Sequence, residues 1–384
     1  MKSINIINGN IFFEGEKIEQ GSLSIDSSNI SLSENLQADL TLNAEGLLVL
    51  PGIIDLHGDA FERQIMPRPG VNFGHQAALL ETDNQMISNG ITTAYHGLTY
   101  SWEPGLRGTQ AAIDFVEALI AVRPRLRADT RLHLRFETYN LPAEEIISQW
   151  MEEGIVDLFA FNDHMANIDK QIHNPAKLSV YAGRTGLSPD EFIQLHDSIK
   201  SVADQVPAAV ERLAEIARNQ QIPMASHDDE TPEMREFYQK LGCEICEFPV
   251  DITTARYATE QQNPVIMGAP NVMRGGSHCG RLSAIESIQE GLCTVLTSDY
   301  YYPTLMLSAF KLAQSKVVSL EQAWNLISKN PAIAVKQPEK GVISEGKRAD
   351  LILVDCSNSQ MPVVKAVIVN GNLQYSTQIQ ELLV

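Results

Sequence analysis

The 384-residue sequence has little cysteine, few basic residues and no long hydrophobic run. No apolar stretch approaches the length that spans a bilayer, so we expect no membrane segment. The first residues, MKSINIINGN, lack the apolar core of a signal peptide, and the five cysteines are scattered and odd in number. These features argue against a secreted disulfide framework and predict reduced thiols in the cytoplasm. The one CxxC pair, Cys243 and Cys246, has no second CxxC beside it, and we interpret it as buried, inert thiols.

Basic residues are outnumbered, because 29 lysines and arginines stand against 48 acidic residues and the formal net charge is -19. A general nucleic-acid-binding surface needs clustered Lys and Arg, so this composition argues against one. A small phosphorylated substrate stays compatible with the charge, since a few local arginines or metal ions are enough to bind phosphate.

The middle of the chain, residues 51–330, alternates strand-like and helix-like segments. The strand-like segments are GIIDLH, TTAYHGL, RLHLRFE, VDLFAFND, IPMASHDD, EICEFP, PVIMGAPN and CTVLTSDY. Amphipathic segments such as TQAAIDFVEALIAVRPR and AAVERLAEIARNQQ lie between most of them. Eight strands with intervening helices predict an α/β fold, a (β/α)8 TIM-like barrel. A doubly wound sheet is the alternative, but no GxGxxG follows the first strand.

The two ends of the chain, residues 1–50 and 331–384, share a different style. Short alternating runs with turn residues between them, such as VNGN, predict strands and hairpins. We expect both ends to build one small composite β-sandwich beside the barrel. Residues 165–189 are interpreted as a long connection after a strand that could cover the site as a lid.

Side chains that bind metals end five of the eight strands. His57 and Asp59 are two residues apart, so they point to the same face of an extended strand. The other strand ends supply Glu137, Asp163, His164, His227, Asp228, Asp229 and Asp299. The C-terminal ends of barrel strands meet at one rim, so we expect these side chains to converge there.

Imidazole and carboxylate groups gathered in this way indicate a divalent metal site of one or two ions, and Zn, Mn and Fe suit them alike. The strongest members are His57, His164, His227 and Asp299, because each ends a separate strand. A bound ion makes water more acidic, and a nearby carboxylate can take its proton as general base. Asp299 is the candidate for that base.

Some of the neighbouring polar residues have plainer alternatives. A strand-end Asp is often a helix N-cap, which suits Asp229, and Asp163 could instead orient an imidazole. His133 is expected inside the barrel near its bottom, whereas His96 could reach a substrate.

A candidate anion-binding loop follows the strand VIMG. It contains Arg274, two glycines, Ser277 and His278, which offer a forked cation and exposed backbone N–H groups. Arg68, stiffened by a proline on each side, is a second candidate anion contact. On composition alone, both segments could be ordinary loops.

The motifs together resemble a known group. PGIIDLHGD on the first strand, the split β-structure and the tail GVISEGKRADLILVD are similar to the amidohydrolase superfamily. Within it, MGAPNVMRGGSHCG and TSDYYYP resemble a branch that acts in phosphonate use. The resemblance implies that the metal ligands are His57, Asp59, Glu137, His164, His227 and Asp299. It also implies that Glu137 bridges and that Asp59 replaces the second His of the usual His-x-His.

The reaction implied by this branch is attack of water on the triphosphate of a ribose 1-phosphonate, releasing pyrophosphate. Arg68 and Arg274 would then hold the outer phosphates while metals neutralise the developing charge. The alternative is an amidohydrolase that cleaves a C–N bond of a small cyclic amide or deaminates a small molecule. The expected partner is a small, phosphorylated substrate, with no nucleic acid and no membrane, and a homo-oligomer is compatible with the sequence.

Overall fold

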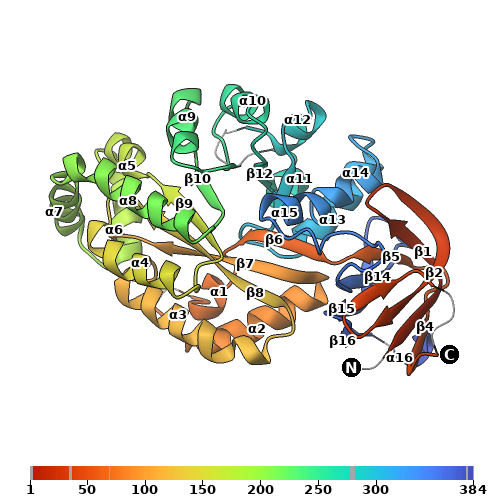
Figure 1. Cartoon of the computed structure of the whole chain (residues 1–384). Helices are drawn as coiled ribbons and strands as arrows, with labels where there is room; N and C mark the ends of the chain where they lie inside the picture. The colour runs from red at the N-terminus through yellow and green to blue at the C-terminus, as the bar shows by residue number, and fades with distance from the viewer. Residues whose placement is uncertain (1–2, 34–36, 69, 277–281, 378, 384) are drawn as a thin grey trace.

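A barrel of eight parallel strands forms the centre of the molecule (Figure 1). The structure is a computed structural model, and it describes residues 3–33, 37–68, 70–276, 282–377 and 379–383. The barrel strands are β6 (Ile53–Gly58), β7 (Ile91–Tyr100), β8 (Asp129–Glu137), β9 (Leu158–Asn162), β10 (Met224–His227), β11 (Ile245–Glu247), β12 (Val265–Gly268) and β13 (Val295–Thr297).

The eight strands pair in chain order, and a parallel bridge between Gly58 and Asp299 joins the last strand region to the first. A sequential sheet whose ends meet is a barrel and not a doubly wound sheet. The predicted (β/α)8 fold is therefore confirmed, and each of the eight strand-like segments overlaps one barrel strand.

The barrel strands are apolar because both of their faces are covered. All residues of β6, β7 and β9 are buried. Alternate side chains point inward or outward: Leu56 and Tyr95 pack in the barrel interior, whereas Leu98 and Phe136 pack under the surrounding helices. Polar side chains are also buried within the strands, as Asp55 of β6 shows, and they need hydrogen-bond partners there.

Helices surround the barrel and connect its strands (Figure 1). They are α1 (Glu62–Ile65), α2 (His75–Ser88), α3 (Thr109–Val122), α4 (Glu144–Glu152), α8 (Val206–Asn219), α9 (Pro232–Lys240), α10 (Ile252–Glu260), α11 (Ala269–Arg274), α12 (Ala284–Gln289), α13 (Thr304–Gln314), α14 (Leu320–Asn325) and α15 (Lys329–Ala334). None of the described helices combines the length and the apolar character that crossing a membrane requires.

The segment expected as a long connection is mostly helical. It contains α5 (Met165–Gln171) and α6 (Pro175–Thr185), and it leads into α7 (Pro189–Lys200). Asn174 and Ser188 cap the last two helices, each directly before a proline at the first helical position. We call α5–α7 the cap helices. They have a small apolar cluster of their own, which includes Phe192 and is separate from the barrel core.

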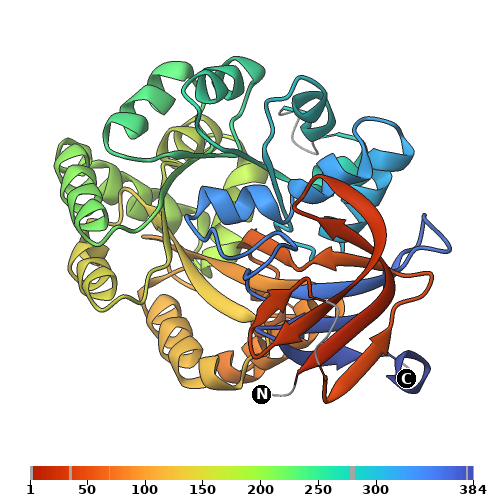
Figure 2. The same ribbon diagram turned by 45° about the vertical axis from the view of Figure 1, so that its right-hand side comes forward.

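Both ends of the chain form a second sheet beside the barrel (Figure 2). Its strands are β1 (Ile4–Phe13), β2 (Lys17–Asp26), β3 (Asn29–Ser31), β4 (Leu40–Asn43), β5 (Leu48–Pro51), β14 (Leu351–Asp355), β15 (Val363–Val369) and β16 (Asn372–Ser376). The order is β16-β15-β14-β5-β1-β2-β3, with β4 paired to β1. The expected composite of the two termini takes the form of one continuous mixed sheet, followed by α16 (Ile379–Leu382).

Alternate residues of the second sheet attach it to the barrel. In β5, Leu48 and Leu50 pack with the barrel helices, whereas Val49 packs in the sheet's own core. The same alternation places Ile352 of β14 on the barrel side and Leu353 in the sheet core. The period of two therefore gives the sheet two buried faces.

Candidate metal centre

A cavity of about 350 Å³ opens at the C-terminal ends of the barrel strands. Its lining includes all six residues expected as ligands, namely His57, Asp59, Glu137, His164, His227 and Asp299. Arg274 of α11 and the cap-helix residues Tyr181 and Arg184 also line it. The strand ends thus converge on one site, and the cap helices form part of its wall.

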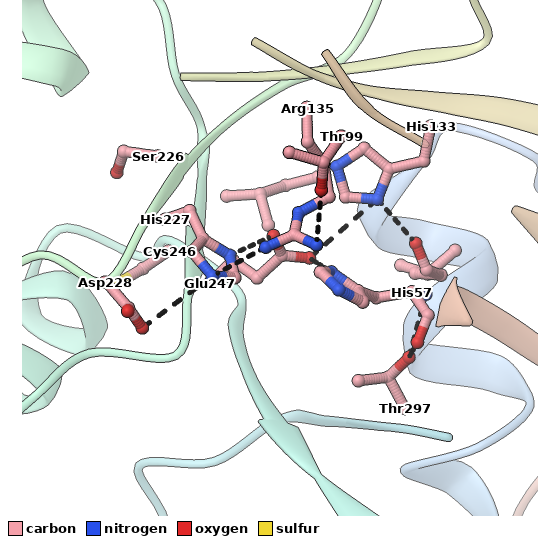
Figure 3. A network of polar contacts seen from close by, with 12 residues as sticks. His57, Thr99, His133, Arg135, Ser226, His227, Asp228, Cys246, Glu247 and Thr297 are labelled. Carbon is pink, nitrogen blue, oxygen red and sulfur yellow. Dashed lines mark hydrogen bonds and ion pairs between the residues drawn. The ribbon is translucent and has the colours of Figure 1, made fainter. Parts of the chain in front are cut away.

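Glu247, the last residue of β11, lies between histidines of neighbouring strands (Figure 3). It is fully buried, and its Oε1 and Oε2 lie 2.8 Å from Nδ1 of His57 and 2.8 Å from Nδ1 of His227. His133 is also close, with Nδ1 4.0 Å from Oε1 of Glu247 and 3.0 Å from the carbonyl oxygen of Leu56. One carboxylate therefore holds two imidazoles by hydrogen bonds and lies close to a third.

These contacts fix the proton positions on two of the rings. An ionised carboxylate only accepts hydrogen bonds, so His57 and His227 each donate from Nδ1 to Glu247. A neutral imidazole that carries its proton on Nδ1 keeps a lone pair on Nε2. A carboxylate behind an imidazole is a common way to orient a metal-binding histidine.

A second group forms around His164. Its Nδ1 lies 2.6 Å from Oε1 of Glu137, and its Nε2 lies 3.6 Å from Oδ2 of Asp228. The other oxygen of Asp228 is 3.8 Å from Nε2 of His227. Glu137 thus contacts one histidine, whereas Asp228 and Glu247 each lie between two histidines.

The seam between β6 and β13 holds a third group. The backbone N–H of Asp299 donates to the carbonyl of His57, and the N–H of Asp59 donates to the carbonyl of Asp299, both at 2.9 Å. Below them, Asp55 accepts from the backbone N–H of Ser298 at 3.0 Å and from its hydroxyl at 2.5 Å. Asp299 has a φ of 54°, a left-handed conformation that non-glycine residues rarely adopt.

Charges of like sign crowd the site. Burial, and to a smaller extent the negative charge of Glu62, raises the pKa of Asp59 to about 7. Burial lowers the pKa of His57 to about 3, so this ring is neutral at neutral pH and able to act as a ligand. The pKa of His164 rises to about 10, chiefly because Glu137 lies beside it. A bound cation would stabilise the ionised form of Asp59, whose pKa burial and the neighbouring carboxylates now raise.

The donor atoms fit such a cation. In each of three groups, the possible ligand atoms lie within 4.8 Å of one another. The groups are His57, His133 and Glu247; His164, His227 and Asp228; and His57, Asp59 and Asp299. Mixed imidazole and carboxylate donors at this spacing suit a divalent first-row metal.

Comparison with known proteins decides the family. The Amidohydrolase family matches residues 48–374. The chain belongs to the amidohydrolase family. A relative, the alpha-D-ribose 1-methylphosphonate 5-triphosphate diphosphatase of Escherichia coli (strain K12), is 33% identical over 360 residues, which are 91% of this chain and 94% of the relative.

Solved structures agree on the fold. N-acetylglucosamine-6-phosphate deacetylase from Pasteurella multocida has a TM-score of 0.64 at 12% identity, covering 98% of this chain and 100% of that one. Dihydropyrimidinase from Brevibacillus agri has a TM-score of 0.56 at 14% identity, covering 100% of this chain and 96% of that one. The resemblance to the amidohydrolase superfamily that the motifs carry is confirmed.

The two arginines expected to bind phosphate, Arg274 and Arg68, lie at different places in this amidohydrolase. Arg274 lines the cavity at the end of α11. Arg68 is exposed, pairs its backbone with Val71, and is not among the residues that line the cavity. Ser277 and His278 lie outside the described residues.

The expectations for His96 and Asp229 are corrected. His96 points away from the cavity and packs edge-on against Phe61 and Phe115, with ring centroids 5.3 and 6.0 Å away. Asp229 is not the N-cap of α9, because Thr231 caps that helix and Asp229 is buried against Ser226 and Arg235. This happens because the chain bends at the strand end and the helix starts later.

Asp163 has a different partner from the imidazole that the sequence suggested. Its Oδ1 accepts from the backbone N–H of Met165 at 3.1 Å, at the start of α5. Cys243 and Cys246 are both fully buried, and burial raises the pKa of the Cys243 thiol to about 12, as expected of inert thiols.

Two residues of the centre were not expected from the sequence. Glu247 ends the strand EICEFP, and a strand-end carboxylate was the signal that could have found it. Arg135 lies two residues before Glu137 on β8, so the period of two places it on the same face, but its contact with His227 has no local signal.

Proposed function

We propose that this amidohydrolase is a metal-dependent hydrolase that cleaves a phosphoanhydride bond in the triphosphate of a ribose 1-phosphonate, releasing pyrophosphate in phosphonate catabolism. The observation that carries the proposal is the 33% identity, over nearly the full length of both chains, to a diphosphatase of that substrate class. The cavity is suited to such a substrate, because the candidate metal ligands share it with several arginines.

We assign the divalent metal, Zn, Mn or Fe, to the donors at the cavity floor. His57, Asp59 and Asp299 form one candidate set of ligands, and His164, His227 and Asp228 form another. When bound, such an ion polarises a phosphoryl oxygen and makes water more acidic. Glu247 and Glu137 hold the imidazoles in the orientation that leaves Nε2 for the metal.

Protein side chains supply the other two functions, proton transfer and phosphate binding. Asp299, at the rim of the β6–β13 seam, takes the proton of the attacking water on a carboxylate oxygen. Arg274 lines the cavity and is exposed, and we assign its guanidinium to the outer phosphates. Arg107 and Arg184 also line the wall, but they are already paired with Glu62 and Glu103.

The test is product analysis with ribose 1-methylphosphonate 5-triphosphate. Purified enzyme with Zn, Mn or Fe should release pyrophosphate, and Asp299→Asn should lose activity by a factor of about 100 to 10,000, the usual contribution of a general base. Release of ammonia from small cyclic amides or amines, without pyrophosphate release, would instead establish the C–N hydrolase. The free thiols among the described cysteines support a reducing, cytoplasmic setting for this reaction.

A further inference from the structure

Arg135 lies inside the metal centre itself. It extends from β8 towards His227 and Thr99 and is buried (Figure 3). Its Nη2 lies 3.1 Å from Nε2 of His227, and its Nη1 lies 3.1 Å from Oγ1 of Thr99 and 3.9 Å from Oδ2 of Asp59. A fixed cation is therefore built into a site whose other groups are histidines and carboxylates.

The contact with His227 involves the atom that a metal would use. Arginine has donors only, so Nε2 of His227 must accept from Arg135. The Nδ1 of the same ring is already engaged with Glu247 at 2.8 Å. Both nitrogens of His227 are thus occupied, and an ion on His164, His227 and Asp228 would have to displace the guanidinium.

Arg135 is also closely confined. A Cβ placed on Gly97 of β7 would lie 3.4 Å from Cδ of Arg135 and 3.4 Å from Nε2 of His57. The stem of Arg135 therefore packs directly against the β7 backbone, at a position without a side chain. Thr99, two residues further along the same strand, accepts from its guanidinium. Strand β7 thus holds the cation in place.

The other set of ligands is less affected. His57, Asp59 and Asp299 have mutually close donor atoms, and the ion pair of Arg135 with this set is the longer contact of 3.9 Å with Asp59. Repulsion between like charges disfavours a second divalent ion beside a guanidinium in a buried site. The two sets are therefore unequal, although the sequence presents their ligands as equivalent.

We propose that Arg135 replaces a second metal ion, so that the centre binds one divalent ion, on His57, Asp59 and Asp299. Arg135 then supplies the neighbouring positive charge to the phosphoryl group. This inference rests on the metal centre of the proposed function and decides how many ions that centre takes.

Metal counting tests the proposal without measuring activity. Protein dialysed to equilibrium against Mn²⁺ should retain one ion per chain by elemental analysis, with the EPR signal of isolated Mn²⁺. Arg135→Met, which keeps an apolar stem and removes the charge, should retain two ions and give an exchange-coupled signal. Arg135→Lys, which keeps the charge, and Arg107→Met, which removes another cavity arginine, should each retain one.

Two ions in the wild-type chain, or one ion in a folded Arg135→Met protein, would overturn the proposal. If Arg135→Met does not fold by circular dichroism, His227→Asn decides instead: it should still retain one ion, and loss of that ion refutes the assignment. Measurement of pyrophosphate release tests the proposed reaction separately. One ion without pyrophosphate release supports the role of Arg135 and rejects the reaction, whereas no bound ion rejects both.

Discussion

Nδ1 of His57 donates to Oε1 of Glu247 across 2.8 Å, in a fully buried contact between β6 and β11. Although burial works to raise it, the pKa of Glu247 lies well below its usual range, because its interactions with the imidazoles of His57 and His133 and the hydrogen bonds from His227 and His57 lower it. The carboxylate therefore stays ionised, and it accepts from His227 with its other oxygen. This single residue fixes the orientation of rings from two different strands.

Glu247→Gln should weaken metal binding while leaving the fold intact. The amide has nearly the same shape, but it offers one acceptor where two imidazole N–H groups need one each. Loss of such a partner behind metal-binding histidines typically costs about 10 to 100-fold in affinity. Competition with a metal-sensitive chelator measures the effect. Glu144→Gln, which changes a carboxylate paired with Arg212 outside the three donor groups, is the matched control. Equal affinities for both variants would contradict the role of Glu247.

Arg274→Ala should raise KM for the triphosphate with a smaller effect on kcat. A hydrogen bond to a charged group contributes about 1.5–3 kcal/mol, which corresponds to about a 10 to 100-fold change in binding. Arg68→Ala is the control, because it removes the same charge from an exposed position that does not line the cavity. Steady-state kinetics of pyrophosphate release measure both variants. A larger KM effect from Arg68 would show that the outer phosphates bind elsewhere.

Asp55→Asn should destabilise the barrel at its seam. Asp55 accepts hydrogen bonds from Thr297, from Ser298 and from the backbone N–H of His57. An amide cannot accept at both positions, and an unsatisfied buried polar group costs about 1–3 kcal/mol. Urea unfolding measures the loss. Asp39→Asn, at an exposed contact with Ser3, should change stability by less than about 0.5 kcal/mol. Similar losses for the two variants would be inconsistent with the seam depending on Asp55.

The barrel could be predicted from the sequence because buried parallel strands are unusually uniform. A strand covered on both faces is apolar along its length, as in β9, and turns polar only at the rim. The same property predicted that His57, His164 and Asp299 would meet. Convergence at the rim follows from topology, so it needs no knowledge of side-chain rotamers.

Convergence of the strand ends at the rim does not say which face of a strand each side chain takes. His96 and Gly97 are adjacent on β7, yet Gly97 faces His57 whereas His96 faces the helices, because alternate residues point to opposite faces. The proline-flanked Arg68 follows no strand, so nothing in its pattern fixes where it points. The contact of Arg135 with His227 was not predicted, because the two residues are 92 positions apart in the chain.

The cap helices show a different kind of error, in which the local signals were present. Asn174 and Ser188 each precede a proline, and Ser188 with Glu191 forms a capping box. These are helix-start signals that the loop interpretation did not use. Arg184 of α6 donates to Glu103 and lines the cavity, so the cap is part of the site's wall.

His96→Leu should make the protein more resistant to mild acid. The ring is buried, and neither nitrogen has a hydrogen-bond partner among the described residues. Burial, and to a smaller extent the charge of Arg123, lowers the pKa of His96 to about 3. The unfolded chain therefore takes up a proton as the pH falls below the ordinary value of 6.5, whereas the folded chain does not. Between about pH 7 and about pH 5 the wild type should lose about 2 kcal/mol through this residue, and the variant should not. Unfolding by urea at both pH values measures the difference, with His173→Gln at an exposed position as the control. Because the ring faces away from the cavity, pyrophosphate release at neutral pH should be unchanged. An equal pH dependence in the wild type and the Leu variant would mean that His96 is protonated, and so hydrogen-bonded, in the folded protein.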